Sequence, residues 1–314
     1  MIKTGIRRLL LLAVTLLLVT VLAFVAFSII PGDPTDSILG MNATEEQIAV
    51  LRSQLGLDLP LWQRYWNWLS GFLTGDLGTS YNFDMPVATL LSSRIVPTLT
   101  LAGMSFVLIL VISVPLGVLS ARYAGGRLDK ALTVLTHLNM SVPGFVMGIA
   151  VVYLFGLVLK WFRPGGYVSP EEGLGAYLRF MLFPSLAVAL PKSAMTVKML
   201  RSSILSELHA DYVRTARAKG NPPGATLWRH VLRNAMLPVV TFLATIMAEL
   251  LAGSIVVEQV FSIPGLGQML VSSIGNRDYP VVQAIIVLVG FAVVVCNFLA
   301  DSVYHLLDPR LKGR

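Results

Sequence analysis

Long apolar runs alternate with shorter polar stretches along this chain. A membrane-spanning helix needs about 20 mostly apolar residues. Six segments meet this requirement: Leu9–Ile30, about Val96–Ala121, about Leu132–Leu159, about Phe180–Leu200, Met236–Val257 and Val281–Leu299. The pattern therefore predicts an all-α membrane protein with six transmembrane helices.

The first apolar run has a second interpretation, as a secretory signal peptide. Lys3, Arg7 and Arg8 precede it, and the tripeptide AFS at Ala26–Ser28 resembles a cleavage site. The apolar region of a typical signal peptide has about 7–15 residues, whereas this run has 22. We therefore expect it to remain as a membrane helix that ends at Pro31-Gly32.

Composition supports the membrane interpretation. The chain is 55% hydrophobic and 13% charged, whereas ordinary soluble domains carry about 25% charged residues. A chain so poor in charge is solvated mostly by lipid. The single cysteine, Cys296, lies in an apolar run, which excludes an internal disulfide and a cysteine-based metal cluster.

The distribution of Lys and Arg predicts the orientation. With the N-terminus inside, the expected cytosolic stretches hold 17 of these residues and the opposite side holds 7. Eight of the 17 lie between Lys192 and Arg233. Because cytosolic loops of membrane proteins are enriched in Lys and Arg, both termini are expected to be cytosolic. The net charge of +7 thus reflects topology and does not indicate nucleic-acid binding.

The stretch between the first two predicted spans should contain helices of its own on the outer side. Thr44 and Gln47 have the spacing of a capping box at the start of a helix. After Pro60 the segment LWQRYWNWLSGF is rich in Trp and Tyr, residues that favour the headgroup layer of a bilayer. We interpret this segment as an interfacial helix, with an aromatic substrate cage as the alternative.

The longest internal polar stretch contains the segment DYVRTARAKG, Asp211–Gly220. Because no Gly or Pro occurs from Ile204 to Lys219, we expect one helix there, ended by Gly220. A second short helix, about Ala225–Asn234, should lead to Pro238 at the start of the fifth span. The loop could be an amphipathic lipid anchor. A sharp turn between two helices fits insertion into a protein groove better.

The loop sequence DYVRTARAKG (Asp211–Gly220) followed by RHVLRNAMLPVVT (Arg229–Thr241) resembles the cytosolic coupling loop of ABC-importer permease subunits, specifically those of the dipeptide/oligopeptide/nickel group. The motifs that carry the resemblance are IIPGDP (Ile29–Pro34), LGLDLPLWQRY (Leu55–Tyr65), GDLGTS (Gly75–Ser80), PTLTLAG (Pro97–Gly103), SVPGF (Ser141–Phe145), EQVFSIPGLG (Glu258–Gly267), RDYPVVQ (Arg277–Gln283) and LLDPRLK (Leu306–Lys312). They follow the family order and cover nearly the whole chain.

The resemblance implies that the loop helix docks in a cleft of a separate ATPase subunit. The implied coupling residues are Asp211, Tyr212, Arg214, Thr215, Ala216, Arg217, Ala218, Lys219 and Gly220. Gly220 would permit the close turn and Ala216 the close approach. The general importer motif has Glu-Ala-Ala before the loop glycine. Here Arg214 and Thr215 stand at the first two positions of that motif, and only Ala216 matches it. Members of the peptide/nickel group resemble this chain at these positions.

The chain itself lacks the residues for enzymatic chemistry. It has no G-x-x-x-x-G-K-[ST] phosphate loop, no HExxH pair and no G-x-S-x-G elbow. We therefore expect no catalytic residue, metal ligand or cofactor in this chain. ATP and Mg would be bound by partner ATPase subunits.

Polar residues within the apolar spans are candidates for a translocation path, because charges in lipid are costly and usually face a partner or water. Glu249 lies in the fifth span, and His137, Asn139 and Ser141 lie in the third, next to Pro143-Gly144, which should loosen the helix. The alternative is that these residues join helices by buried hydrogen bonds.

The sequence thus predicts a six-span importer permease in a bacterial inner membrane, most directly for di- or oligopeptides. We expect an N-terminal membrane helix over residues 1–30, an external loop over 31–95 and a five-helix core over 96–314 that includes the coupling loop 201–235. The expected partners are a second six-span permease, two ATPase subunits, an external solute-binding protein and the bilayer. The alternatives are nickel, metal chelates or glutathione as solute, a gradient-driven transporter or channel, or a membrane enzyme or assembly factor.

Overall fold

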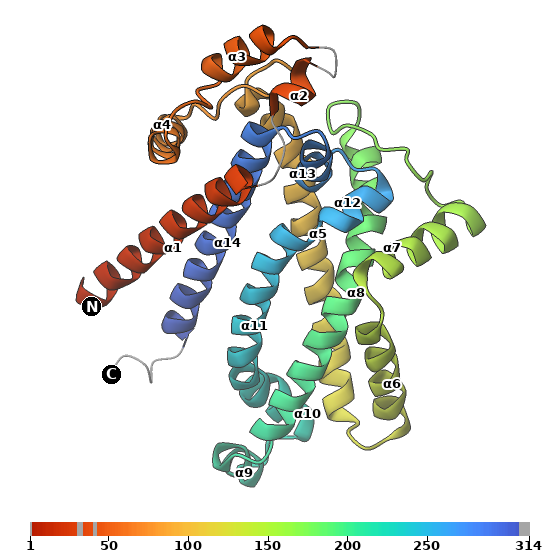
Figure 1. The fold of residues 1–314 in the computed structure, drawn as a ribbon. Helices are drawn as coiled ribbons and strands as arrows, with labels where there is room; N and C mark the ends of the chain where they lie inside the picture. Colours follow the sequence, from red (N-terminus) through yellow and green to blue (C-terminus); the bar gives the residue numbers. More distant parts are fainter. Residues whose placement is uncertain (1, 30–33, 40–42, 308–314) are drawn as a thin grey trace. The chain divides into compact units, whose positions relative to one another are not determined.

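The computed structural model describes residues 2–29, 34–39 and 43–307, which form helices and connecting turns (Figure 1). The α-helices are α1 (Ile2–Ile29), α2 (Pro34–Leu39), α3 (Glu45–Gln54), α4 (Leu61–Thr74), α5 (Val87–Arg122), α6 (Arg127–Ser141), α7 (Gly144–Val151), α8 (Leu174–Glu207), α9 (Asp211–Ala218), α10 (Pro223–Thr226), α11 (Leu232–Gly253), α12 (Ile255–Phe261), α13 (Leu266–Gly275) and α14 (Tyr279–Leu307). Two π-helical segments, η1 (Val152–Val158) and η2 (Leu227–Val231), follow α7 and α10. The predicted all-α class is confirmed.

Two predictions fall outside the described residues. They are the end of the first helix at Pro31-Gly32 and the basic residues Arg310, Lys312 and Arg314. Most of the IIPGDP and LLDPRLK motifs lies there as well.

Five described helical segments are long and apolar enough to cross a membrane, and two bent helix pairs raise the number to as many as seven. The five lie within α1, α5, α8, the continuous stretch Pro223–Gly253, and α14. The bent pairs are α6 with α7–η1 and α12 with α13. The predicted six spans fall within this range.

The prediction of a continuous third span was wrong. Its two parts, Arg127–Ser141 and Gly144–Val158, meet at an angle of 105°. Val142, which precedes Pro143, has an extended backbone (φ −89°, ψ 123°), because the proline ring disfavours the helical conformation of the residue before it. The loosening predicted at Pro143-Gly144 is therefore a complete break of the helix.

The chain divides into two compact units. The first contains residues 1–98 and 264–294. In it the side chains of α4 pack on α1: the Tyr65 ring meets Phe24 edge-on at 5.4 Å, and the Tyr65 hydroxyl lies 2.9 Å from Thr20 Oγ1. Trp62 and Trp66, in contrast, are 63% and 59% exposed. The capping box predicted at Thr44 and Gln47 is present at the start of α3.

A buried carboxylate in the same unit joins the GDLGTS and RDYPVVQ motifs. Asp278 accepts hydrogen bonds from Ser80 Oγ (2.5 Å), Tyr81 N (3.1 Å) and Asn82 N (3.3 Å). Asp278 is fully buried, and a buried carboxylate is tolerated only when its oxygens are satisfied. Residues 80–82 are therefore fixed to the start of α14.

Replacing Asp278 with Ala should loosen this segment. A hydrogen bond to a charged group contributes about 1.5–3 kcal/mol, so we expect the amide hydrogens of Tyr81 and Asn82 to exchange with solvent at least ten times faster. Hydrogen exchange with mass spectrometry measures this, with the exposed Asp84→Asn as control. Unchanged exchange at both amides would show that the carboxylate does not hold the segment.

The second unit contains residues 99–263 and 295–314. α8 packs against α6, α7 and α11. A core of small and branched apolar side chains runs through α5, α8 and α11, and includes Ile109, Leu200 and Leu243. Pro184 and Pro191 lie inside α8 without ending it, as occurs in membrane helices when neighbouring groups satisfy the freed carbonyls.

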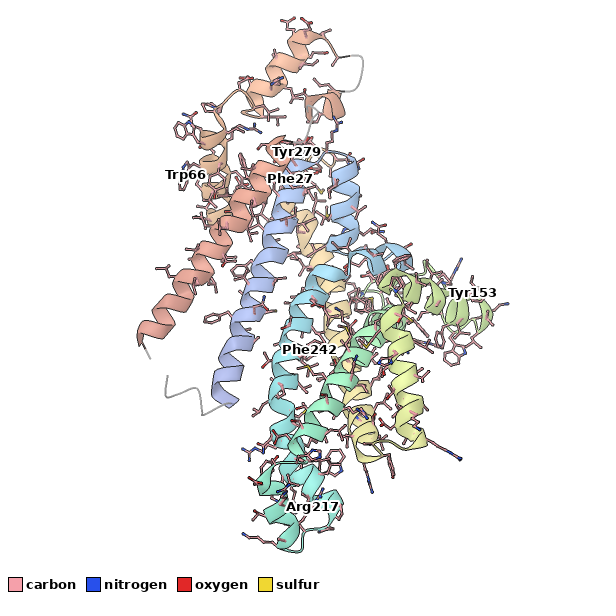
Figure 2. The ribbon with its side chains drawn as sticks, turned by 60° about the horizontal axis from the view of Figure 1, so that its bottom comes forward. Phe27, Trp66, Tyr153, Arg217, Phe242 and Tyr279 are labelled. Atoms are coloured by element: carbon pink, nitrogen blue, oxygen red, sulfur yellow. The ribbon has the colours of Figure 1, made fainter. Side chains whose placement is uncertain are left out.

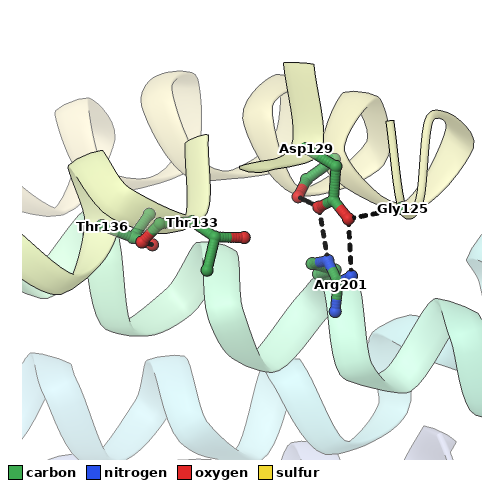
Figure 3. A network of polar contacts seen from close by, with 6 residues as sticks. Gly125, Asp129, Thr133, Thr136 and Arg201 are labelled. Carbon is green, nitrogen blue, oxygen red and sulfur yellow. Dashed lines mark hydrogen bonds and ion pairs between the residues drawn. The ribbon is translucent and has the colours of Figure 1, made fainter. Parts of the chain in front are cut away.

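A second buried carboxylate joins three helices of this unit (Figure 3). Asp129, near the start of α6, receives two parallel bonds of 2.7 Å from Arg201 of α8. Ser120 Oγ of α5 and Gly125 N also donate to it, at 2.5 and 2.8 Å. Bidentate Arg–carboxylate pairs are among the strongest hydrogen-bonded pairs in proteins. We call this group the Asp129 network.

Candidate translocation surface and coupling loop

The loop between the fourth and fifth predicted spans differs from the predicted helix–turn–helix in two ways. The helix expected over Ile204–Lys219 is divided, because α8 continues to Glu207 and α9 begins only at Asp211. Ala210 between them is extended (φ −69°, ψ 148°), and Asp211 in the first turn of α9 interacts favourably with the helix dipole. The second helix is also not a separate short one: α10, η2 and α11 follow without a break.

The α9 helix is anchored in the core of the second unit. Val213 is fully buried and belongs to the core that includes Leu227 and Val231 of η2. Ala216 is 8% exposed and faces the same way. The remaining polar side chains of α9 lie outward, with Arg217 at the tip of the loop (Figure 2). Ala216 is thus covered by this chain itself, and its small size serves internal packing.

The outward side of α9 is the only part of the helix that a partner can reach in this fold. Its exposed members are Asp211, Arg214, Thr215, Arg217 and Ala218, followed by Lys219 and Gly220. Asp211 and Arg214 form an exposed ion pair at 3.8 Å, a kind of pair that contributes little to stability. These polar groups are therefore free to exchange partners.

Two residues fix the ends of α9. The Tyr212 hydroxyl donates to Glu207 at 2.5 Å, and burial raises the pKa of Tyr212 above its ordinary value. Gly220 has a φ of +85°, a left-handed conformation that costs residues with a Cβ free energy. A Cβ at Gly220 would meet nothing within 4 Å, so the backbone conformation alone requires glycine.

A polar stripe runs along α8 and α11 in the second unit. On α8 its members recur at three- and four-residue spacing: Lys192, Met195, Met199, Ser202 and Ser206. On α11 they are Pro238, Phe242, Thr245 and Glu249. Since residues three and four apart lie on the same face of a helix, each set forms one continuous surface. We call the two together the α8–α11 stripe.

A groove occupies the part of the stripe nearer the loop. It has a volume of about 630 Å³ and is lined by Met140, Met195, Lys198, Met199, Ser202, Ser203, Ser206, Glu207, Pro238 and Phe242. Ser203 Oγ donates to the carbonyl of Ala235 at 2.8 Å, which joins the two helices beneath the groove. Flexible Met side chains and Ser hydroxyls give the groove an adaptable, partly polar lining.

An ion pair lies at the other end of the stripe. Lys192 Nζ contacts Glu249 Oε2, and the two side chains are 29% and 52% exposed. Glu249 is a candidate from the sequence, and the charge distribution places Lys192 with the cytosolic stretch, whereas in the structure Lys192 lies near the middle of α8. The signal for it was present, since Lys192 is a cation inside the predicted fourth span, about Phe180–Leu200.

The three candidates from the third predicted span, His137, Asn139 and Ser141, all lie on α6. Asn139 Nδ2 donates to the carbonyl of Leu135, and Ser141 Oγ to the carbonyl of His137, both within α6. None of the three lines the groove, to which α6 contributes Met140. Two residues on, a helix has turned by about 200°, so His137 and Asn139 point in nearly opposite directions.

The described residues contain five helical segments that are long and apolar enough to cross a membrane. Two of them carry the α8–α11 stripe and are joined by the α9 loop, an arrangement typical of a membrane permease subunit. The comparison with protein families agrees. Residues 113–313 match the family described as binding-protein-dependent transport system inner membrane component, and residues 1–102 match its N-terminal counterpart. This chain belongs to that family and is a multi-pass inner-membrane protein.

Relatives of similar length support the assignment. The chain is 36% identical to the probable peptide ABC transporter permease protein y4tP of Sinorhizobium fredii, over 98% of both chains. It is 36% identical to the oligopeptide transport system permease protein AppB of Bacillus subtilis, again over 98% of both. It is 37% identical to the glutathione transport system permease protein GsiC of Pectobacterium atrosepticum, over 99% of both.

The fold is also similar to a solved transporter. The inward-facing MetNI methionine ABC transporter superposes with a TM-score of 0.55 at 19% identity, covering 70% of this chain and 96% of that one. At 19% identity, this similarity shows that the two chains share a fold.

Proposed function

We propose that this chain forms one half of the translocation path of an ATP-driven importer of di- and oligopeptides. The relatives named for peptide and oligopeptide transport match it over nearly their whole length, which supports the solute class. The protein would pair with a second permease, two ATPase subunits that bind ATP and Mg, and an external solute-binding protein. With both termini cytosolic, the α9 loop faces the ATPase subunits.

The observation that carries the proposal is the connection of the loop to the α8–α11 stripe. Val213 of α9 packs into the same core as Leu243 and Ile246 of α11. Because packed cores move between discrete arrangements, a displacement of α9 by a closing ATPase dimer would pass into α11. The coupling residues Asp211 to Gly220 would bind the ATPase with the outward side of α9.

The path would follow the α8–α11 stripe, including Glu249. A charged side chain at the centre of a bilayer costs about 2.5–3.5 kcal/mol, so an exposed Lys192–Glu249 pair favours water or a second permease over lipid. His137, Asn139 and Ser141 would line the path only where α6 borders it.

Glutathione is the second candidate solute, since GsiC is as similar to this chain as the peptide permeases are. Glutathione is itself a small peptide, so one path could serve both. For nickel or metal chelates, the described residues contain no group of three or more His, Cys, Asp or Glu that could hold a metal ion.

Reconstitution tests the proposal. The chain is extracted from its native membrane with its bound subunits, placed in liposomes with its solute-binding protein, and supplied with ATP. We expect uptake of radiolabelled tri-alanine that stops when ATP is replaced by a non-hydrolysable analogue. Parallel assays with glutathione and nickel rank the solutes. Recovery of this chain alone, with uptake that follows an ion gradient, would overturn the proposal.

A further inference from the structure

We propose that Lys192 and Glu249 form a binding subsite for zwitterionic solutes, in which Glu249 takes the ammonium group and Lys192 the carboxylate. The inference rests on the proposed function and deepens it, because it assigns the step at which this chain recognises its solute. The pairing of Lys192 with Glu249 joins positions 57 residues apart and comes from the packing of α8 against α11.

The first argument is the position of the pair. Lys192 lies near the middle of α8, and Glu249 lies in α11, both within segments apolar enough to span a membrane. The two helices pack against each other. Ionised side chains at such a depth face water, a partner or one another, and these two contact each other.

The second argument is exposure. The Glu249 side chain is 52% exposed and that of Lys192 is 29% exposed. The pair thus differs from the Asp129–Arg201 pair, whose carboxylate is buried and only 5% exposed. Glu249 keeps one side open to whatever passes along the stripe. An ion pair with an open side can exchange its partners.

The third argument is the surroundings. One helical turn before Glu249 on α11, Thr245 is exposed, and its hydroxyl donates to the carbonyl of Thr241 in the same helix. One helical turn after Lys192 on α8, Met195 is 37% exposed and is the first residue of α8 that lines the groove. The pair therefore stands at the entrance of a surface with hydroxyl and thioether groups, which suits a polar solute of variable shape.

Charge balance decides the class of solute. When the pair opens around a solute with one ammonium and one carboxylate, each side chain gains an opposite charge and the site stays neutral. A solute with a single charge would leave Lys192 or Glu249 unpaired at membrane depth, which is costly. Peptides of different sequence share only a backbone and these two termini, so the subsite would accept many side chains.

The test compares peptides that lack one charged terminus. The complete transporter, reconstituted with its solute-binding protein, receives tri-alanine, tri-alanine amide or N-acetyl-tri-alanine, each at a concentration that saturates the binding protein. The ratio of uptake of the free acid to the amide reports recognition of the carboxylate. The ratio to the acetylated peptide reports recognition of the ammonium group.

We expect Lys192→Met to lower the acid-to-amide ratio at least fivefold relative to the unaltered chain and to leave the acid-to-acetyl ratio unchanged. Glu249→Gln should do the reverse. Selectivity of the binding protein cancels, since it is common to all variants. Lys130→Met, an exposed lysine on α6, is the matched control and should change neither ratio.

The charge-swapped double variant Lys192→Glu/Glu249→Lys gives a second readout. A zwitterion can bind it in the opposite direction, so uptake of tri-alanine should recover relative to either single variant. Ratios that stay constant in both single variants would overturn the inference while leaving the importer function intact. Absence of ATP-driven uptake by the unaltered complex would instead contradict the proposed function, and the inference with it.

Discussion

Replacing Asp129 with Ala is expected to lower the free energy of unfolding of the chain by about 3 kcal/mol. Removing one partner of a buried ion pair costs about 3–5 kcal/mol, because the other charge remains buried and unpaired. Arg201 keeps 31% of its side chain exposed and can be partly solvated, which places the effect at the lower end. The measurement is thermal unfolding of the purified protein in detergent, together with the yield of inserted protein.

A double variant separates the lost charge from the lost packing. Asp129→Leu/Arg201→Met removes both charges and leaves apolar groups of similar length, so most of the stability should return. The single variant Arg201→Lys should still be markedly less stable than the unaltered chain, since an ammonium group cannot form the two parallel hydrogen bonds to Asp129. Glu171→Ala, at an exposed position, serves as control. Equal unfolding temperatures for Asp129→Ala and the unaltered chain would contradict the role of the Asp129 network.

Replacing Gly220 with Val is expected to reduce ATP-driven uptake at least tenfold while the chain remains inserted. A β-branched residue at a φ of +85° is strained, so the turn after α9 should adopt another conformation. If α9 binds the ATPase as proposed, its outward residues would then meet that subunit in a different orientation. Uptake and the amount of ATPase that co-purifies are measured on the same membranes.

Gly224→Val is the matched control, because Gly224 has no positive φ and no atom within 4 Å of an added Cβ. Its uptake should stay within about twofold of the unaltered chain. Gly220→Ala should fall between the two, since Ala is less restricted than Val. If Gly220→Val transports normally, the left-handed turn has no part in coupling.

Hydrophobic runs and local capping rules predicted most elements of this fold. The long apolar segments appear as α1, α5, α8, α11 and α14, and the capping box of Thr44 appears where the spacing required it. These features depend on residues close together in the chain. The break of the third span was harder to predict, since a proline can either bend or end a membrane helix.

The loop boundaries were less predictable for a different reason. No Gly or Pro occurs between Ile204 and Lys219, so propensity alone favours one helix. The fold breaks it at Leu208–Ala210 so that Val213 can turn into the core beside Leu227 and Val231. Tertiary packing of one apolar side chain outweighed local preference.

The two ion pairs that join helices in the second unit could not be predicted from sequence spacing. Asp129 and Arg201 are 72 residues apart, and Lys192 and Glu249 are 57 apart. No periodic rule connects positions at such distances. Only the three-dimensional packing of α8 against α6 and α11 brings them together.

The Asp278 contact also sets an order of events during synthesis. Ser80 and its carboxylate partner are 198 residues apart, and at about 5–20 residues per second the ribosome needs roughly 10–40 seconds to make the intervening chain. During that interval the segment around Ser80 has already been translated and lacks its partner. Its ordered form is therefore a late product of biogenesis, completed only when the last apolar segment begins to enter the membrane.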